Sequence, residues 1–95
     1  MPACFGLLTI ELHLPEAQTL KDKRQVLQSL LGRLGARFNL SVAETGANDL
    51  HQRAEIVLAC VSNTVEHCQE VLDNALALVE SEPRASVLRV EKEFG

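Results

Sequence analysis

Apolar residues in this chain switch between a two-residue repeat and a helical repeat, and this switching limits its fold more than any motif does. In residues 3–14 the apolar residues lie two positions apart, which predicts a strand with one buried face. From Thr19 they recur every three or four positions as far as Phe38, which predicts a helix. Asp22 follows Thr19 by three residues, as in a capping box, so we expect the helix to begin at Thr19.

The rest of the chain repeats this alternation. Residues 39–44 and 52–61 have the periodicity of strands. Asn63, with Glu66 three residues later, predicts the cap of a second helix, and Pro83 ends that helix. Residues 86–94 predict a last strand that turns three apolar residues toward the core: Leu88, Val90 and Phe94.

The order of these elements is strand, helix, strand, strand, helix, strand. In a chain of 95 residues without a low-complexity linker, this order predicts one domain, residues 1–95. Two right-handed crossovers place both helices on one face of a four-stranded antiparallel sheet. We therefore predict an α+β, ferredoxin-like βαββαβ sandwich with strand order 4-1-3-2. That fold hosts many unrelated functions, so by itself it says little about chemistry.

Composition argues against several functional classes. The net charge of −4 disfavours non-specific binding to nucleic acid, so we expect no DNA partner. Three Phe and no Tyr or Trp leave too few stacking platforms for a reader of single-stranded RNA. The three Cys lack CxxC spacing and the three His lack HxxxH spacing, so we expect no metal, no cofactor and no disulfide framework. No phosphate loop or nucleophile with its base is recognisable, so we expect no enzymatic activity.

The N-terminal segment has no basic region before its apolar stretch, and no run approaches the roughly 18 apolar residues of a membrane helix. We therefore expect a cytoplasmic protein without a membrane partner. The cytoplasm keeps thiols reduced. The sequence leaves open whether Cys4 and Cys60, expected to face the core on neighbouring strands, ever oxidise.

Basic residues gather in the first predicted helix, whereas the second predicted helix carries acids only. Two interpretations stand: the helices complement each other electrostatically, or the basic helix docks on phosphates or on an acidic partner. Lys23 lies near the apolar side of its helix, where it either pairs with Glu44 or Glu11 or contributes to an anion site at the helix N-terminus. The candidate nucleic-acid or anion-binding residues are Lys21, Lys23, Arg24, Arg33, Arg37 and Arg53.

The sheet face without helices is expected to be apolar at one end. We predict that a second copy of the chain covers this end, because surfaces rarely leave such a patch exposed; a loop or the C-terminal segment is the alternative cover. The candidate residues of this dimer interface are Phe5, Leu7, Val57, Ala59 and Val61. The other end groups Glu11, His13, Arg53 and Glu55, which we interpret as a cross-strand polar network rather than as acid–base machinery.

Three stretches of the chain resemble the YlxP-like family of small uncharacterised bacterial proteins (domain of unknown function family 503). They are LTIELHLPEAQTLKDKR (residues 8–24), RFNLSVAE (37–44), and DLHQRAEI followed by VSN (49–56 and 61–63). The resemblance implies a ferredoxin-like fold and no established activity. Genes of the family often lie near those for translation initiation and small-subunit maturation, which implies a role around the ribosome. The chain departs from the family at His51, where Trp is common, and at Gly46, where an acid is frequent, so the chemistry of that loop differs here.

These observations support two hypotheses of function. The first is a non-enzymatic cytoplasmic factor that associates with the ribosome or with RNA through the basic helix. The second is a self-associating, dimeric module that binds a small anion or a protein through the open sheet face.

Overall fold

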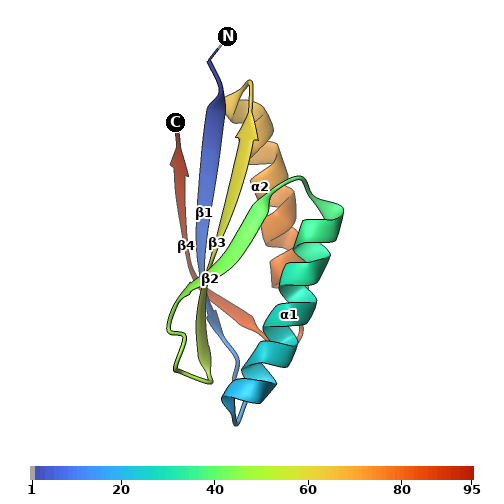
Figure 1. Cartoon of the computed structure of the whole chain (residues 1–95), viewed down its shortest axis with the longest axis vertical. Coiled ribbons are helices and arrows are strands. Elements are labelled where there is room, and N and C mark those ends of the chain that lie inside the picture. Colours follow the sequence, from blue (N-terminus) through green and yellow to red (C-terminus); the bar gives the residue numbers. More distant parts are fainter. Residues whose placement is uncertain (1) are drawn as a thin grey trace.

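Six elements follow one another in the order that the sequence predicts. The structure is a computed structural model and describes residues 2–95. The elements are β1 (Cys4–His13), α1 (Leu20–Arg37), β2 (Ser41–Gly46), β3 (Arg53–Ser62), α2 (Val65–Glu80) and β4 (Ser86–Phe94). All strand pairs are antiparallel and the sheet order is β2-β3-β1-β4, which is the predicted order read from the other edge. Both helices cover the same face of the sheet, and the other face has no helix (Figure 1).

The core lies between the sheet and the two helices. β1 and β3 form the centre of the sheet, and alternate residues of each are fully buried, as the two-residue repeat predicts. The fully buried residues include Leu8, Ile10, Leu12, Ile56 and Leu58 of the sheet, and Leu30, Leu34, Leu72 and Val79 of the helices. Gly6 allows β1 to pass close beneath α2, because a Cβ atom there would lie 2.8 Å from Leu72 Cδ1.

The N-terminus of α1 confirms the predicted cap. The Thr19 hydroxyl accepts a hydrogen bond from Asp22 N (3.1 Å), and the Asp22 carboxylate accepts one from Gln18 N (2.9 Å). The buried stripe differs in detail from the expected one. Leu20 remains 36% exposed, while Lys23 and Val26 are buried.

The second helix begins one residue later than predicted. Its cap is Thr64 rather than Asn63: Thr64 has extended backbone dihedrals, and its hydroxyl accepts a hydrogen bond from His67 N (3.1 Å). Both residue types are good caps, so the local sequence does not distinguish them. β2 is also displaced along the chain relative to the predicted 39–44, because residues 38–40 form a bend closed by Leu40 N and Phe38 O (3.1 Å).

The prediction that Leu88 faces the core is wrong. The pairing of β4 with β1 shifts register, so that Glu11 pairs with Arg89 whereas Leu12 pairs with Val87. This irregularity breaks the alternation in β4, buries part of Val87 and leaves Leu88 48% exposed. β2, on the other edge of the sheet, has a similar register shift between Glu44 and Gly46.

Two glycines of α1 are expected to reduce the stability of the helix although no close contact requires a glycine at either position. A Cβ atom at Gly32 or Gly35 would meet nothing within 4 Å. We therefore expect Gly32→Ala and Gly35→Ala each to raise the free energy of unfolding by about 0.5–1 kcal/mol, as measured by urea denaturation. Gly6→Ala is the contrasting variant and should destabilise, because its Cβ would crowd Leu72. Neutral or destabilising effects at Gly32 and Gly35 would contradict this prediction.

Candidate functional site

The six candidate cations do not form one continuous surface. Lys21 and Arg24 are three residues apart and exposed in the first turns of α1, so they are neighbours on the helix surface. Arg33 and Arg37 form a second neighbouring pair near its C-terminus. Arg33 is nine positions after Arg24, which corresponds to about 14 Å along the helix axis. The structure therefore places two basic pairs at opposite ends of α1.

Lys23 is not a surface cation. Its side chain is 1% exposed, and its ammonium group lies 3.1 Å from Glu44 Oε2. The ammonium also donates hydrogen bonds to the carbonyl oxygens of Ala47 (2.8 Å) and Arg53 (3.1 Å). The structural ion pair with Glu44, one of the two alternatives left open by the sequence, is therefore formed. Lys23 is therefore not available to an RNA or anion ligand, and its prediction as a nucleic-acid or anion-binding residue is wrong.

Arg53 and Arg33 are exposed but already paired. Arg53 lies on the open sheet face, with its guanidinium 2.5 Å from Glu11 Oε1. Arg33 lies 2.6 Å from Glu82 Oε1. We expected the acids of the second helix to complement α1, but Glu82 lies beyond the end of that helix. Within residues 2–95, Lys21, Arg24 and Arg37 have no carboxylate within 4 Å.

Glu82 connects the loop after α2 to α1. Its carboxylate is nearly inaccessible and binds two guanidinium groups, those of Arg33 (2.6 Å) and Arg84 (2.8 Å). It also accepts hydrogen bonds from the backbone N–H of Arg84 (3.0 Å) and from its Nε (2.9 Å). These hydrogen bonds from Arg84, and the charges of Arg84 and Arg33, lower the pKa of Glu82 to about 2 despite the opposing effect of burial.

The apolar end of the open face is continuous across the two central strands. The register pairs Phe5 with Val61 and Leu7 with Ala59, so all four side chains lie on the same face. Phe5 is 39% exposed and Val61 69% exposed. Val57 follows Ala59 on that face of β3. The five candidate interface residues therefore lie together at one end of the open face.

The polar end of this face is an ion-pair network. Glu11 and Glu55 are directly opposite each other on β1 and β3, an arrangement that is unfavourable by itself. Arg53 neutralises Glu11, and the Thr45 hydroxyl donates a hydrogen bond to Glu55 Oε1 (2.7 Å). Each carboxylate thus has a structural partner.

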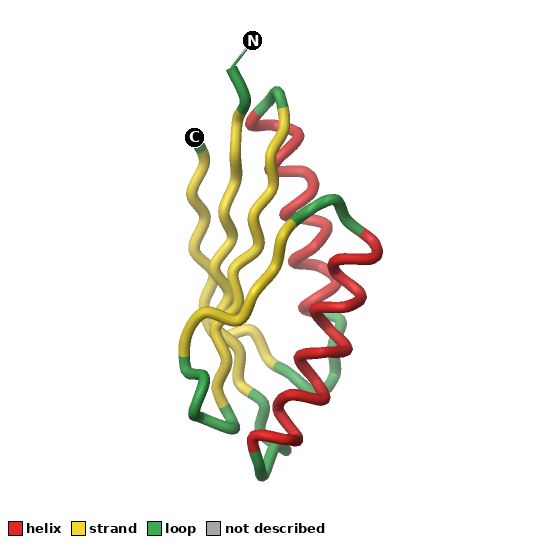
Figure 2. The backbone as a smooth tube through the Cα atoms, viewed as in Figure 1, coloured by secondary structure: helices red, strands yellow, loops and turns green. Residues whose placement is uncertain are grey.

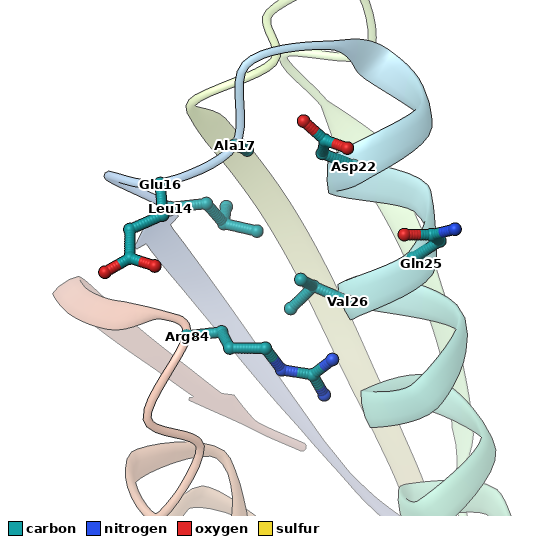
Figure 3. Close-up of a pocket in the computed structure, with 7 residues that line it drawn as sticks. All are labelled: Leu14, Glu16, Ala17, Asp22, Gln25, Val26 and Arg84. Carbon is teal, nitrogen blue, oxygen red and sulfur yellow. The ribbon is translucent and has the colours of Figure 1, made fainter.

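A small pocket opens between the start of α1 and the loops beside it (Figure 3). Its volume is about 180 Å³, and Leu14 and Val26 provide apolar walls. Figure 3 shows Arg84 reaching toward Val26 of α1. Arg84 is held by Glu82, and the Asp22 carboxylate is occupied by the cap, so two of the three charged side chains that line this pocket have structural roles; the third is Glu16.

The three cysteines meet at one end of the fold. Cys68 Sγ, on α2, lies 3.6 Å from the carbonyl oxygen of Cys60 and 3.9 Å from that of Cys4. Burial, together with the neighbouring Cys68 thiol, raises the pKa of Cys60. A buried thiol with a raised pKa is a poor nucleophile.

Among residues 2–95, no cluster of three or more His, Cys, Asp and Glu side chains has the arrangement of a metal site. No helix in this part of the chain is long and apolar enough to cross a membrane.

Comparison with solved structures defines the class of protein. The chain resembles the de novo designed protein Foldit4, with a TM-score of 0.56, 12% identity, and coverage of 99% of this chain and 97% of that one. It also resembles a C-terminal segment of the alpha subunit of aIF2 from Pyrococcus abyssi, with a TM-score of 0.58 and 16% identity over 94% of this chain and 51% of that one. At these identities the similarity shows the fold alone, and the class is a ferredoxin-like α+β domain.

The family follows from the sequence comparisons. The family model "Protein of unknown function (DUF503)" matches residues 5–92. The chain is 35% identical over 79 residues to the "Uncharacterized protein YlxP" of Bacillus subtilis (strain 168). This alignment covers 83% of this chain and 86% of that protein. The chain therefore belongs to the DUF503 family, as its resemblance to the YlxP-like family implied.

Two structural features were not found from the sequence. Glu82 was counted with the acids of the second helix, but it lies beyond the last helical residue, Glu80. Arg84 is two residues from Glu82 and reaches it locally, whereas only the tertiary structure brings Arg33 to it. The groove between α1 and α2 was also missed, because its walls come from residues more than 30 positions apart.

The depressed pKa of Glu82 predicts an acid-sensitive contribution to stability. The folded-state pKa is about 2, against an ordinary value of 4.5, so the unfolded chain takes up the proton more readily. The contribution is complete above pH 4.5 and is lost as pH falls toward 2. We expect Glu82→Gln to lower the free energy of unfolding at pH 7 by about 2 kcal/mol, after allowance for the solvent exposure of both arginines.

Denaturant unfolding of both proteins at several pH values checks this expectation. The difference between the unmodified protein and Glu82→Gln should shrink as pH falls from 4.5 to 2. Glu80→Gln is the matched control, because Glu80 is exposed and makes no ion pair within residues 2–95. A difference that does not depend on pH would contradict the assignment of this carboxylate.

Proposed function

We propose that this protein is a non-enzymatic cytoplasmic factor that associates with the ribosome or another RNA through exposed cations of α1. Those cations are Lys21 and Arg24, with Arg37 at the far end of the helix. The observation that carries the proposal is that Lys21 and Arg24 are adjacent, exposed and without a carboxylate partner in residues 2–95. Phosphate groups are the ligands that such cations bind most strongly in RNA.

The position of these two cations supports the proposal. Basic side chains in the first turn oppose the helix dipole, so they reduce the stability of α1. An anion bound there would benefit both from the positive charges and from the partial positive charge of the helix N-terminus. The one acid of the first turn, Asp22, accepts a hydrogen bond from Gln18 N and belongs to the cap, so it does not neutralise the pair by direct contact.

The contacts would be made to the RNA backbone rather than to bases. The open sheet face carries one exposed aromatic side chain, Phe5, which is too few for base stacking. With Lys23 buried and Arg33 and Arg53 engaged in ion pairs, about two to three cations remain for phosphates. Binding should therefore be weak and sensitive to salt.

Charge reversal of the adjacent pair tests this function. We expect the double variant Lys21→Glu/Arg24→Glu to lose salt-dependent cosedimentation with purified ribosomal subunits and binding to a fluorescent RNA duplex. The slope of log K against log salt should decrease in magnitude by about 1.5–2, because two phosphate contacts are lost. Arg89→Glu/Lys92→Glu is the control, since it changes the net charge equally on β4. Equal binding by the unmodified protein and the α1 variant would refute the proposal.

A second candidate function is self-association through the open sheet face. The cross-strand pairs Phe5–Val61 and Leu7–Ala59 favour it, because they form a continuous apolar surface in which Phe5 and Val61 are exposed and Leu7 and Ala59 half-buried in a single chain. In this function the module is a dimer that presents its helices outward and binds a small anion or a protein through the open sheet face. The first proposal does not depend on it, since the two surfaces lie on opposite sides of the sheet (Figure 2).

Light scattering after gel filtration tests self-association. We expect a dimer for the unmodified protein, and a monomer for Leu7→Glu or Val57→Lys, because a charge would be buried in the apolar contact. Leu50→Glu is the matched control, since Leu50 is 52% exposed but lies on the β2–β3 loop. A monomeric unmodified protein at high micromolar concentration would exclude this candidate.

A further inference from the structure

A groove runs between α1 and α2 on the side of the molecule that faces away from the sheet. Two adjoining hollows of about 310 and 410 Å³ form it and share Arg37, Leu78 and Ser81. Small side chains keep the groove open: Ala36 lines it from α1 and Ala77 from α2. Each hollow has the volume of a small ligand-binding pocket, which is about 300–1,000 Å³.

The floor of the groove has an apolar patch, and polar atoms line much of the rest. Leu78 is 8% exposed and Phe38 is half-buried at one end. Ala36 lines one hollow and Ala77 lines the other, so a leucine-sized side chain can lie beside either without meeting a large neighbour. This part of the groove therefore suits a leucine-sized group better than it suits a hydrated phosphate.

The two walls differ in charge. The α1 wall carries two guanidinium groups, those of Arg33 and Arg37. Arg37 is exposed, lies 5.9 Å from the centre of the Phe38 ring, and has no carboxylate within 4 Å in residues 2–95. The α2 wall is neutral, with Asn74 and Ser81 lining it. The groove therefore presents a net positive edge above an apolar patch.

We propose that this groove binds an acidic peptide segment of a partner protein. A leucine-like side chain of the segment lies between the helices, and an adjacent carboxylate accepts hydrogen bonds from Arg37 and from the N–H groups of Arg33 that Glu82 leaves free. Guanidinium groups bind carboxylates in a bidentate geometry, which favours a carboxylate at this edge. The proposal does not depend on RNA binding at Lys21 and Arg24, which lie at the other end of α1. Of the cations proposed for RNA, only Arg37 is shared with this groove.

Titration of ¹⁵N-labelled protein with synthetic peptides tests this site. The probe is a capped heptapeptide that contains two leucines flanked by glutamates. Two ligands serve as comparisons: the same peptide with lysine in place of each glutamate, and inorganic phosphate. We expect saturable shifts of the amides of Ala36, Arg37, Asn74 and Ala77 with the acidic peptide, with a Kd on the order of 1 mM or tighter. Phosphate should shift these amides without saturating in the same range.

Two variants separate the roles of charge and apolar patch. Arg37→Ala should weaken binding of the acidic peptide about fivefold, whereas Arg24→Ala, on the same helix outside the groove, should change it less than twofold. Ala77→Leu fills the groove without removing any cation, and it should abolish peptide binding while leaving RNA binding unchanged. Gln69→Leu adds a leucine elsewhere on α2 as its control.

Several outcomes would overturn the proposal. Equal shifts with the acidic and lysine peptides would show that no charge selection exists. Full binding by Ala77→Leu would show that the groove is not the site, and saturation by phosphate at the same concentration would show a simple anion site. Shifts at these amides that depend on protein concentration alone would show that a second copy of the chain occupies the groove.

Discussion

A single buried ammonium group holds the edge of this fold together. Lys23 comes from α1, and its partners come from β2, the β2–β3 loop and β3: Glu44, and the carbonyl groups of Ala47 and Arg53. Moving a charge out of water is costly, so a buried lysine is tolerated only where several oxygen atoms replace its hydration. The loop must therefore direct its carbonyl oxygens inward, and Ala47 accepts a positive φ of 57° there. This one interaction both orders the hairpin loop and removes a cation from the surface.

The burial of Lys23 shapes what the rest of the molecule offers a partner. The cations that remain on α1 are separated into two pairs, each with different surroundings. Lys21 and Arg24 project from an open helix end, which suits the phosphates of an RNA backbone. Arg33 and Arg37 flank a groove with an apolar patch, which suits a carboxylate attached to an apolar segment. One basic helix can thus serve two chemically distinct contacts.

The open face of the sheet is a third surface that could bind a partner. The structure of the two edge strands explains why association would use this face rather than an edge. Both edge strands, β2 and β4, have register shifts, and β4 carries charged residues outward. Such irregular, charged edges resist pairing with another sheet. The part of the sheet with an unbroken register is the β1–β3 centre, where Phe5 and Leu7 lie opposite Val61 and Ala59. Association through the sheet would therefore use this face.

Much of the fold could be predicted from the sequence, because its signals are local and agree with one another. The strand periodicity of β1 and β3, the Thr19 cap and the open-face residues were all found in this way. The errors have local causes. Asn63 and Thr64 are both of residue types that cap helices well, and the register shift that exposes Leu88 depends on how β4 pairs with β1. Among the site residues, the sequence predicted the pairing of Lys23 with Glu44 only as one alternative beside pairing with Glu11 and an anion site.

The sequence by itself determined the class of fold and which residues share each face, because a two-residue or helical repeat specifies a side chain's direction wherever one face is buried. Only the tertiary structure decided which charges are free. Arg33 and Arg37 look alike in the sequence, yet Glu82, 49 positions from Arg33, binds Arg33 and does not bind Arg37. Ion pairing depends on distances of a few ångströms between distant segments, and no local pattern encodes such distances.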